Sequence, residues 1–137
     1  MNASDERFRR QEHILRRADF ERAYASGSRI HSRFMTVFVM PNGGPRARLG
    51  VAATRKLGPA VDRNRAKRLA REIFRRHKLG EGLDVVVVPR REMLDASFSS
   101  LEADYIAALN RRHTAPRATG GARRPPRPKP ARRDPRV

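Results

Sequence analysis

One short run of β-branched residues constrains the fold of this chain more than any other feature. Residues 84–89 read Asp-Val-Val-Val-Val-Pro, with no polar residue between the Asp and the Pro. A strand that is apolar at every position has no face to offer to water, so both of its faces must be covered. The run therefore predicts a strand in the interior of a sheet.

Two further strands are predicted upstream of this run. Residues 33–41 alternate between two faces, and both faces are largely apolar. Residues 42–45, Asn-Gly-Gly-Pro, have the composition of a tight turn. Residues 48–56 are therefore predicted to form a second strand, paired with the first as a hairpin.

Helices are predicted on both sides of these strands. Residues 18–26 carry apolar side chains at helical spacing and stop at Gly27, where a left-handed cap is expected. A helix after the valine run is expected to begin at Ser97 or Ser99. The spacing of Ser99 and Glu102 favours a capping box at that end.

A middle helix is predicted after residues 58–59, Gly-Pro, and is expected to end at Gly80 or Gly82. Its apolar positions form one stripe: Ala66, Leu69, Ala70, Ile73 and Phe74. Asn64 is the expected cap at its start, with Asp62 as the competing cap.

The same helix is unusually basic. Residues 63–78 hold eight Lys or Arg and a single acid, Glu72. Cations near a helix start oppose the positive end of the helix dipole, so we expect them to meet an external anion. Side chains four residues apart lie about 5–6 Å from each other, so the row of Lys67, Arg71 and Arg75 could follow a phosphate backbone. The alternative is a solvated charged face, for which mixed signs would be usual.

Composition favours a nucleic-acid partner and an interior compartment. The 137 residues carry a formal net charge of +18, which attracts polyanions. There is no cysteine and no apolar run near the roughly 20 residues that span a bilayer, so we expect a cytoplasmic protein. Residues 111–137 hold ten Lys or Arg and six Pro. We therefore predict one folded domain over residues 1–115 and a disordered basic tail over 116–137.

No catalytic constellation is evident in the sequence. The acids cluster on predicted helix surfaces, at Asp19, Glu21, Glu72, Glu102 and Asp104, and the four His show no metal-ligand spacing. The pair Gly43-Gly44 lacks the Lys and Ser or Thr of a phosphate-binding loop. We predict no catalytic and no metal-binding residue in this chain.

A specific order of motifs runs along residues 14–110. The motifs are ADFERAYASG at 18–27, RFMTVFVM at 33–40, RLGVAATRKLGPAV at 48–61, RNRAKRLAREIF at 63–74, DVVVVPR at 84–90 and SFSSLEADY at 97–105. Together they resemble the bacterial ribonuclease P protein subunit. The resemblance implies an α/β sandwich in the order α-β-β-β-α-β-α, with about four strands and a left-handed β-α-β crossover.

The resemblance also implies partners and sites. In that family the protein assists a catalytic RNA subunit, with Mg²⁺ bound mainly by the RNA, in removing the 5′ leader of precursor tRNA. The positions matching its RNA-subunit contacts are Arg63, Asn64, Arg65, Lys67, Arg68 and Arg71. The positions matching its leader cleft are Phe20, Tyr24 and Phe38, with Arg55 and Lys56 at the rim. No protein partner and no membrane are implied.

Other interpretations remain open on the sequence alone. A ribosomal-type structural RNA-binding protein would share the basic helix without a leader cleft. A DNA-binding protein would place Lys67, Arg71 and Arg75 in a major groove. For any single aromatic residue, core packing is the more common role, and Phe34 and Phe74 are predicted to be core.

Overall fold

The valine run forms β4 (Leu83–Pro89), an interior strand of a four-stranded sheet. The structure is a computed structural model that describes residues 12–14, 16–77, 79 and 82–113. The strand is paired on both sides, antiparallel to β2 (Met35–Pro41) and parallel to β3 (Arg48–Val51). The interior position predicted from the sequence is confirmed. The predicted tail, 116–137, lies outside the described residues.

The sheet order β1-β2-β4-β3 corrects the predicted hairpin. β2 and β3 do not pair with each other, because β4 lies between them. A short strand, β1 (Ser28–His31), pairs antiparallel with the outer side of β2 instead. The buried backbone of β4 needs hydrogen-bond partners along both edges. Separating β2 from β3 supplies both partners at once.

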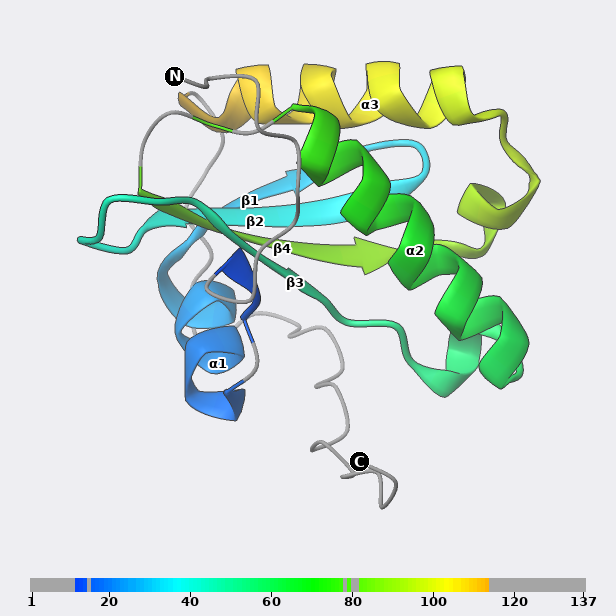
Figure 1. The fold of residues 1–137 in the computed structure, drawn as a ribbon, viewed down its shortest axis with the longest axis horizontal. Helices are drawn as coiled ribbons and strands as arrows, with labels where there is room; N and C mark the ends of the chain where they lie inside the picture. Colours follow the sequence, from blue (N-terminus) through cyan, green and yellow to red (C-terminus); the bar gives the residue numbers. More distant parts are fainter. Residues whose placement is uncertain (1–11, 15, 78, 80–81, 114–137) are drawn as a thin grey trace.

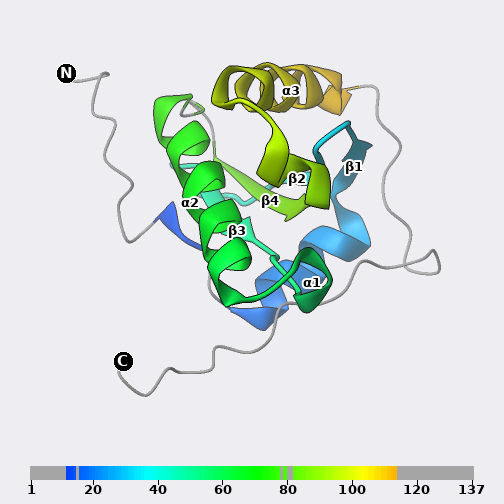
Figure 2. The ribbon, with the colours of Figure 1, turned by 90° about the vertical axis from the view of Figure 1, so that its right-hand side faces the viewer.

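Three helices cover the sheet. α2 (Ala60–Arg76) and α3 (Phe98–Asn110) pack on one face and α1 (Arg17–Ser26) on the other. Figure 1 shows α3 above the sheet, α1 below it and α2 crossing it, and Figure 2 shows the same arrangement from the side. The predicted class and the order α-β-β-β-α-β-α are confirmed. The β3–α2–β4 unit is a parallel crossover, and its left hand stays a prediction.

Short 3₁₀ segments connect these elements. η2 (Arg55–Leu57) links β3 to α2, and η3 (Arg91–Asp95) links β4 to α3. η4 (Arg111–His113) follows α3. In both ribbon views η2 lies below the sheet, as α1 does.

The end of α1 differs from its prediction. Gly27 is extended, with φ −76° and ψ 165°, rather than left-handed. Its N–H donates to the Ala23 carbonyl, and a Cβ at this position would lie 2.7 Å from that oxygen and 3.1 Å from the Val39 carbonyl oxygen. Glycine is therefore required by the close approach of two backbones.

Both ends of α2 also differ from their predictions. The helix begins at Ala60, so Asn64 and the competing Asp62 lie inside it and do not cap it. It ends at Arg76, and the next residue, His77, caps it by donating its N–H to the carbonyls of Ile73 and Phe74. The glycines predicted to end it lie farther along the chain.

Ser97, one of the two predicted caps, begins α3. Its hydroxyl oxygen accepts a hydrogen bond from the Ser100 N–H at 3.2 Å. The predicted capping box is wrong, because the carboxylate of Glu102 faces α2 and lies 2.8 Å from His77 Nε2. This contact joins the two helices on their shared face of the sheet.

The sheet separates two apolar clusters of unequal size. The larger lies under α2 and α3 and includes the predicted core residues Phe34 and Phe74. The smaller lies under α1 and consists of Ile14, Phe20, Ala23, Tyr24, Phe38, Ala52 and Val86. Alternate residues of β2 and β4 serve the two clusters, as the two-residue period of a strand requires.

Candidate nucleic-acid interface

The cations of α2 divide into two groups according to their partners. Arg75 and Arg76, in the last turn, both donate to Glu72; their Nε atoms lie 3.2 Å and 2.9 Å from its carboxylate oxygens. These hydrogen bonds lower the pKa of the Glu72 carboxyl and keep it ionised. Arg75 therefore does not extend the predicted row of Lys67 and Arg71 as a free cation.

The cations nearer the start of α2 have no acidic partner within the described residues. Arg65, Arg68 and Arg71 are exposed, and Lys67 is half-buried. Arg63 donates to the Gly58 carbonyl at 3.0 Å, an uncharged acceptor. Burial and the charges of Arg71 and Arg63 lower the pKa of Lys67. Repulsion among these side chains is unrelieved, and a bound polyanion would relieve it.

The start of α2 is less unfavourable for these cations than the sequence suggested. Asp62 lies in the first turn, where a negative charge complements the helix dipole. Arg65 lies in the second turn, beyond the strongest part of the dipole field. The concentration of unpaired positive charge remains, but it lies along the side of the helix and not at its end.

The three aromatic residues predicted to bind the leader meet under α1. The ring centroids of Phe20 and Tyr24 are 6.5 Å apart, and those of Tyr24 and Phe38 are 5.1 Å apart in an edge-on arrangement. All three are buried, with exposed fractions of 6%, 3% and 0%. Burial and nearby Glu21 raise the pKa of the Tyr24 hydroxyl, which stays neutral. The rings form a packed cluster within the domain and are not open to stacking in this arrangement.

Beyond this aromatic cluster, the α1 face of the sheet continues into residues that are less buried. On this face Thr36 is paired with Val88 across β2 and β4, two residues along from the pair of Phe38 and Val86. Thr36 and Val88 are half-buried, and His31, paired with Thr36 on β1, is exposed. We call Thr36, Val88 and His31 the open strip. The predicted rim residues Arg55 and Lys56 are exposed on η2, whose buried Leu57 packs in the larger cluster.

The sequence reasoning missed Arg29, which lies beside this strip. Its guanidinium carbon is 5.8 Å from the centroid of the Phe38 ring. Its buried Nε has no hydrogen-bond partner among the described residues. Alternation along β1 would have placed Arg29 and His31 on one face, but β1 was not recognised as a separate strand.

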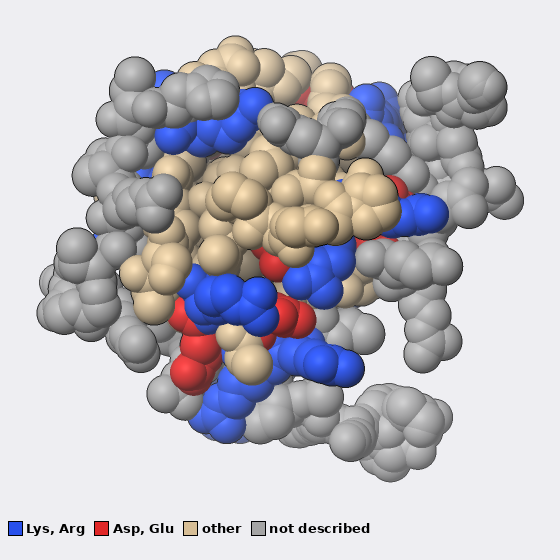
Figure 3. All heavy atoms as spheres, turned by 90° about the vertical axis from the view of Figure 1, so that its left-hand side faces the viewer, with Lys and Arg blue, Asp and Glu red and all other residues tan. Residues whose placement is uncertain are grey.

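The charges on α1 are balanced, in contrast to those of α2. Arg22 lies 2.8 Å from Asp19, and Arg17 lies 3.7 Å from Glu21. Figure 3 shows blue and red side chains interleaved at the lower part of this end of the molecule, where α1 lies. The outer surface of α1 therefore lacks the unpaired positive charge of α2.

Comparison with known proteins identifies the family. A sequence model of the family described as ribonuclease P matches residues 8–113. The chain belongs to the ribonuclease P protein family. It is 40% identical over 108 residues to the ribonuclease P protein component of Desulfovibrio desulfuricans, covering 74% of this chain and 83% of that protein. The Thermotoga maritima component is 39% identical over 90 residues, covering 64% and 77%.

Solved structures of ribonuclease P proteins have the same fold. The Staphylococcus aureus protein aligns with a TM-score of 0.66 at 32% identity, covering 72% of this chain and 93% of that one. The Thermotoga maritima protein aligns with a TM-score of 0.66 at 33% identity, covering 73% and 96%. As a member of this family, the chain takes part in tRNA 5′ processing within an endoribonuclease complex and associates with the ribonuclease P RNA. Family membership decides against the ribosomal and DNA-binding alternatives.

Among the described residues, no group of three or more His, Asp or Glu lies close enough together to hold a metal ion. The buried carboxylates of Asp19 and Asp84 both lie against Arg48, and Asp19 also pairs with Arg22. No helix among these residues has the length and apolar character needed to cross a bilayer.

Proposed function

We propose that α2 binds the ribonuclease P RNA and that the α1 side of the sheet binds the 5′ leader of precursor tRNA. The observation that carries the first part is the difference in pairing along α2. Arg65, Arg68 and Arg71 are exposed without an acidic partner in the described chain, whereas Arg75 and Arg76 share Glu72. Unpaired guanidinium groups bind phosphates without first breaking an internal ion pair.

The RNA-contacting group is proposed to consist of Arg63, Asn64, Arg65, Lys67, Arg68 and Arg71. Lys67 and Arg71 are four residues apart on the helix and can bind neighbouring phosphates of one strand. Asn64 is exposed within the helix, so its amide is free to contact RNA.

The leader is proposed to lie along the open strip, between α1 and η2. Single-stranded nucleic acid is commonly held by an apolar or aromatic floor with a cationic rim. Phe20, Tyr24 and Phe38 support this floor from inside the domain, and Arg55 and Lys56 supply charge at the rim. Because the rings are buried, we infer that they shape the floor and do not stack individually on the bases.

Catalysis is assigned to the RNA partner. A nuclease site in the protein would need converging carboxylates or a His with a suitable neighbour, and the buried Asp19 and Asp84 are both paired with Arg48. We propose that the RNA holds the Mg²⁺ ions and that the protein contributes positioning and charge neutralisation. A cysteine-free chain fits the reducing cytoplasm in which tRNA is processed.

The experiment compares two pairs of arginines on the same helix. Replacing Arg65 and Arg68 together by Ala is expected to weaken binding to the ribonuclease P RNA and to reduce the salt slope of log K by about 1–2. The matched control replaces Arg75 and Arg76 by Ala, which removes the same charge from the paired group. Its salt slope is expected to stay closer to that of the wild type. Affinity is measured as a function of salt concentration.

Equal slopes for the two double variants would contradict the assignment, since net charge alone would then explain binding. A second measurement follows cleavage of precursor tRNA by the reconstituted complex as Mg²⁺ is lowered. The Arg65 and Arg68 variant is expected to need more Mg²⁺ than the control, because fewer protein cations neutralise the RNA.

A further inference from the structure

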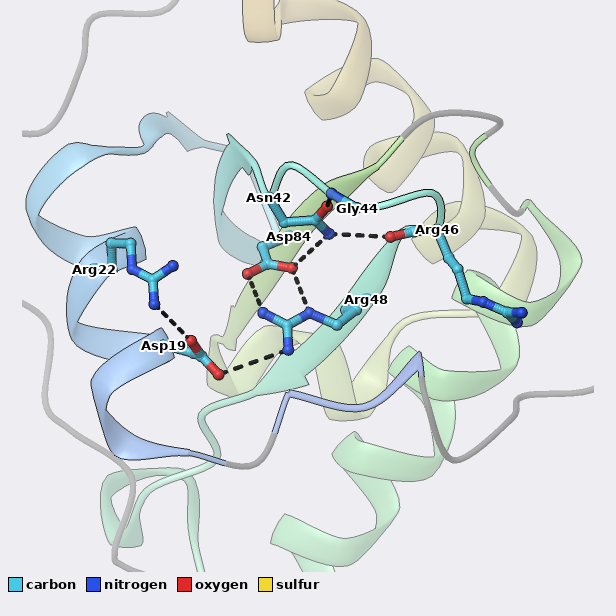
Figure 4. Close-up of polar contacts among 7 residues, drawn as sticks. All are labelled: Asp19, Arg22, Asn42, Gly44, Arg46, Arg48 and Asp84. Carbon is cyan, nitrogen blue, oxygen red and sulfur yellow. Dashed lines mark hydrogen bonds and ion pairs between the residues drawn. The ribbon is translucent and has the colours of Figure 1, made fainter.

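A buried polar network joins α1 to the sheet on the side proposed to bind the leader. Arg48 on β3 makes a two-pronged contact with Asp84 on β4: Nε donates to Oδ1 at 2.8 Å and Nη2 to Oδ2 at 2.7 Å. The third nitrogen, Nη1, lies 3.6 Å from Asp19 on α1. Figure 4 shows the Arg48 guanidinium between the two carboxylates. One planar group therefore connects three elements that are distant in the sequence.

Asn42 adds the loop between β2 and β3 to this network. Its side-chain nitrogen donates to Asp84 Oδ1 at 2.9 Å and to the Arg46 carbonyl at 3.0 Å. Its side-chain oxygen accepts from the Gly44 N–H at 2.7 Å. The network therefore holds this loop as well as α1 (Figure 4).

Burial makes these contacts sensitive to geometry. Asp84 is 2% exposed and Asp19 is 8% exposed, so little water reaches either carboxylate. The hydrogen bonds with Asp84 are the largest contribution raising the pKa of the Arg48 guanidinium, which stays charged. Replacing a buried ion pair by apolar residues often costs little stability, but separating the two charges leaves one of them buried without its partner, which is strongly destabilising. The ion pair therefore favours one position of α1 on the sheet.

The position of α1 is also limited by direct contact with β3. A Cβ at Gly50 would lie 2.8 Å and 2.9 Å from two carbons of the Phe20 ring. Phe20 directly follows Asp19, and Gly50 lies two residues after Arg48 on the same face of β3. The ion pair and the ring contact are thus adjacent, and together they determine where Phe20 lies under α1.

We propose that Asp19, Arg48 and Asp84 are positioning residues for the leader-binding face. They hold α1 at the one place on the sheet where Phe20, Tyr24 and Phe38 form a continuous floor beside the open strip. This inference rests on the proposed leader binding. It adds that the affinity for the leader depends on an ion-pair network that does not itself contact RNA.

The test uses the protein reconstituted with the ribonuclease P RNA and measures a ratio of affinities. The ratio compares precursor tRNA carrying a 5′ leader with the same tRNA lacking it. Asp19→Asn keeps the shape of the side chain but removes the charge that faces Arg48. It is expected to reduce the ratio about two- to thirty-fold. Arg48→Lys, which keeps the net charge but cannot contact both carboxylates in the same way, is expected to reduce it too.

The control variant is Glu102→Gln, on the opposite face of the sheet. It removes one negative charge from a half-buried carboxylate that pairs with His77. Loss of a negative charge in a basic protein strengthens binding to both tRNAs alike. The ratio is therefore expected to stay at the wild-type value in this control. A fall of the ratio in Asp19→Asn alone would then not be a general effect of charge.

Two outcomes separate the inference from the function on which it rests. If Asp19→Asn and Arg48→Lys lower the thermal midpoint but keep the wild-type ratio, the network serves stability only and the inference is overturned. The double replacement of Arg55 and Lys56 by Ala is the reference. If it abolishes the leader preference while the two network variants keep it, leader binding stands and only the role of the network is rejected. If the wild-type complex shows no leader preference, the proposed leader binding fails, and the inference fails with it.

Discussion

The two faces of the sheet are covered in different ways. The face under α2 and α3 has a large apolar cluster, in which Val85, Val87, Phe74 and Leu101 are at most 1% exposed. The face under α1 has a small apolar cluster, a buried ion-pair network and the half-exposed open strip. The first face resembles an ordinary protein core. The second is left partly uncovered, which is what a surface for a ligand requires.

The comparison predicts that the largest stability losses come from the face under α2 and α3. Phe74 is 0% exposed and packs in the larger cluster, so Phe74→Ala leaves a cavity that the neighbouring strands cannot fill. We expect a loss of about 3–5 kcal/mol in the free energy of unfolding, measured by urea denaturation. A loss below about 1 kcal/mol would mean that this core is loosely packed.

An intermediate effect is expected where α1 meets the sheet. Gly50→Ala places a methyl group within 3.0 Å of the Phe20 ring and of Ile14 Cβ, so α1 must shift. We expect a loss of about 1–3 kcal/mol by the same measurement, with a reduced preference for leader-bearing tRNA. Gly44→Ala is the control, since its Cβ would approach only the Asn42 side chain, at 3.3 Å. Equal losses in the two variants would remove the argument for a tight contact under α1.

The smallest effect on stability is expected at the rim of the open strip. Arg55 and Lys56 are exposed on η2, so replacing both by Ala should change the free energy of unfolding by no more than about 0.5 kcal/mol. The same double variant is expected to lose affinity for leader-bearing precursor tRNA. A large loss of stability without a loss of leader affinity would show that these residues serve the fold, and the contrast between the two faces would disappear.

Local sequence pattern was a good guide to the type and the buried side of single elements, but not to their caps. The valine run predicted the interior strand β4, and the stripe from Ala66 to Phe74 predicted the buried side of α2. These predictions hold because side-chain period and hydrophobic burial act within a single segment. The pairing of Arg75 and Arg76 with Glu72, three and four residues away, was also within reach of the sequence.

The sequence by itself therefore determined the three helices, the strands β2, β3 and β4 and the density of positive charge on α2, but not the separate strand β1. Only the tertiary structure decided that β4 separates β2 from β3, because strand partners are chosen by the burial of distant segments. Only the tertiary structure could show that Phe20, Tyr24 and Phe38 pack together out of solvent. The contacts of Arg48 with Asp19 and Asp84 likewise join residues 29 and 36 positions away, and no local pattern encodes such a distance.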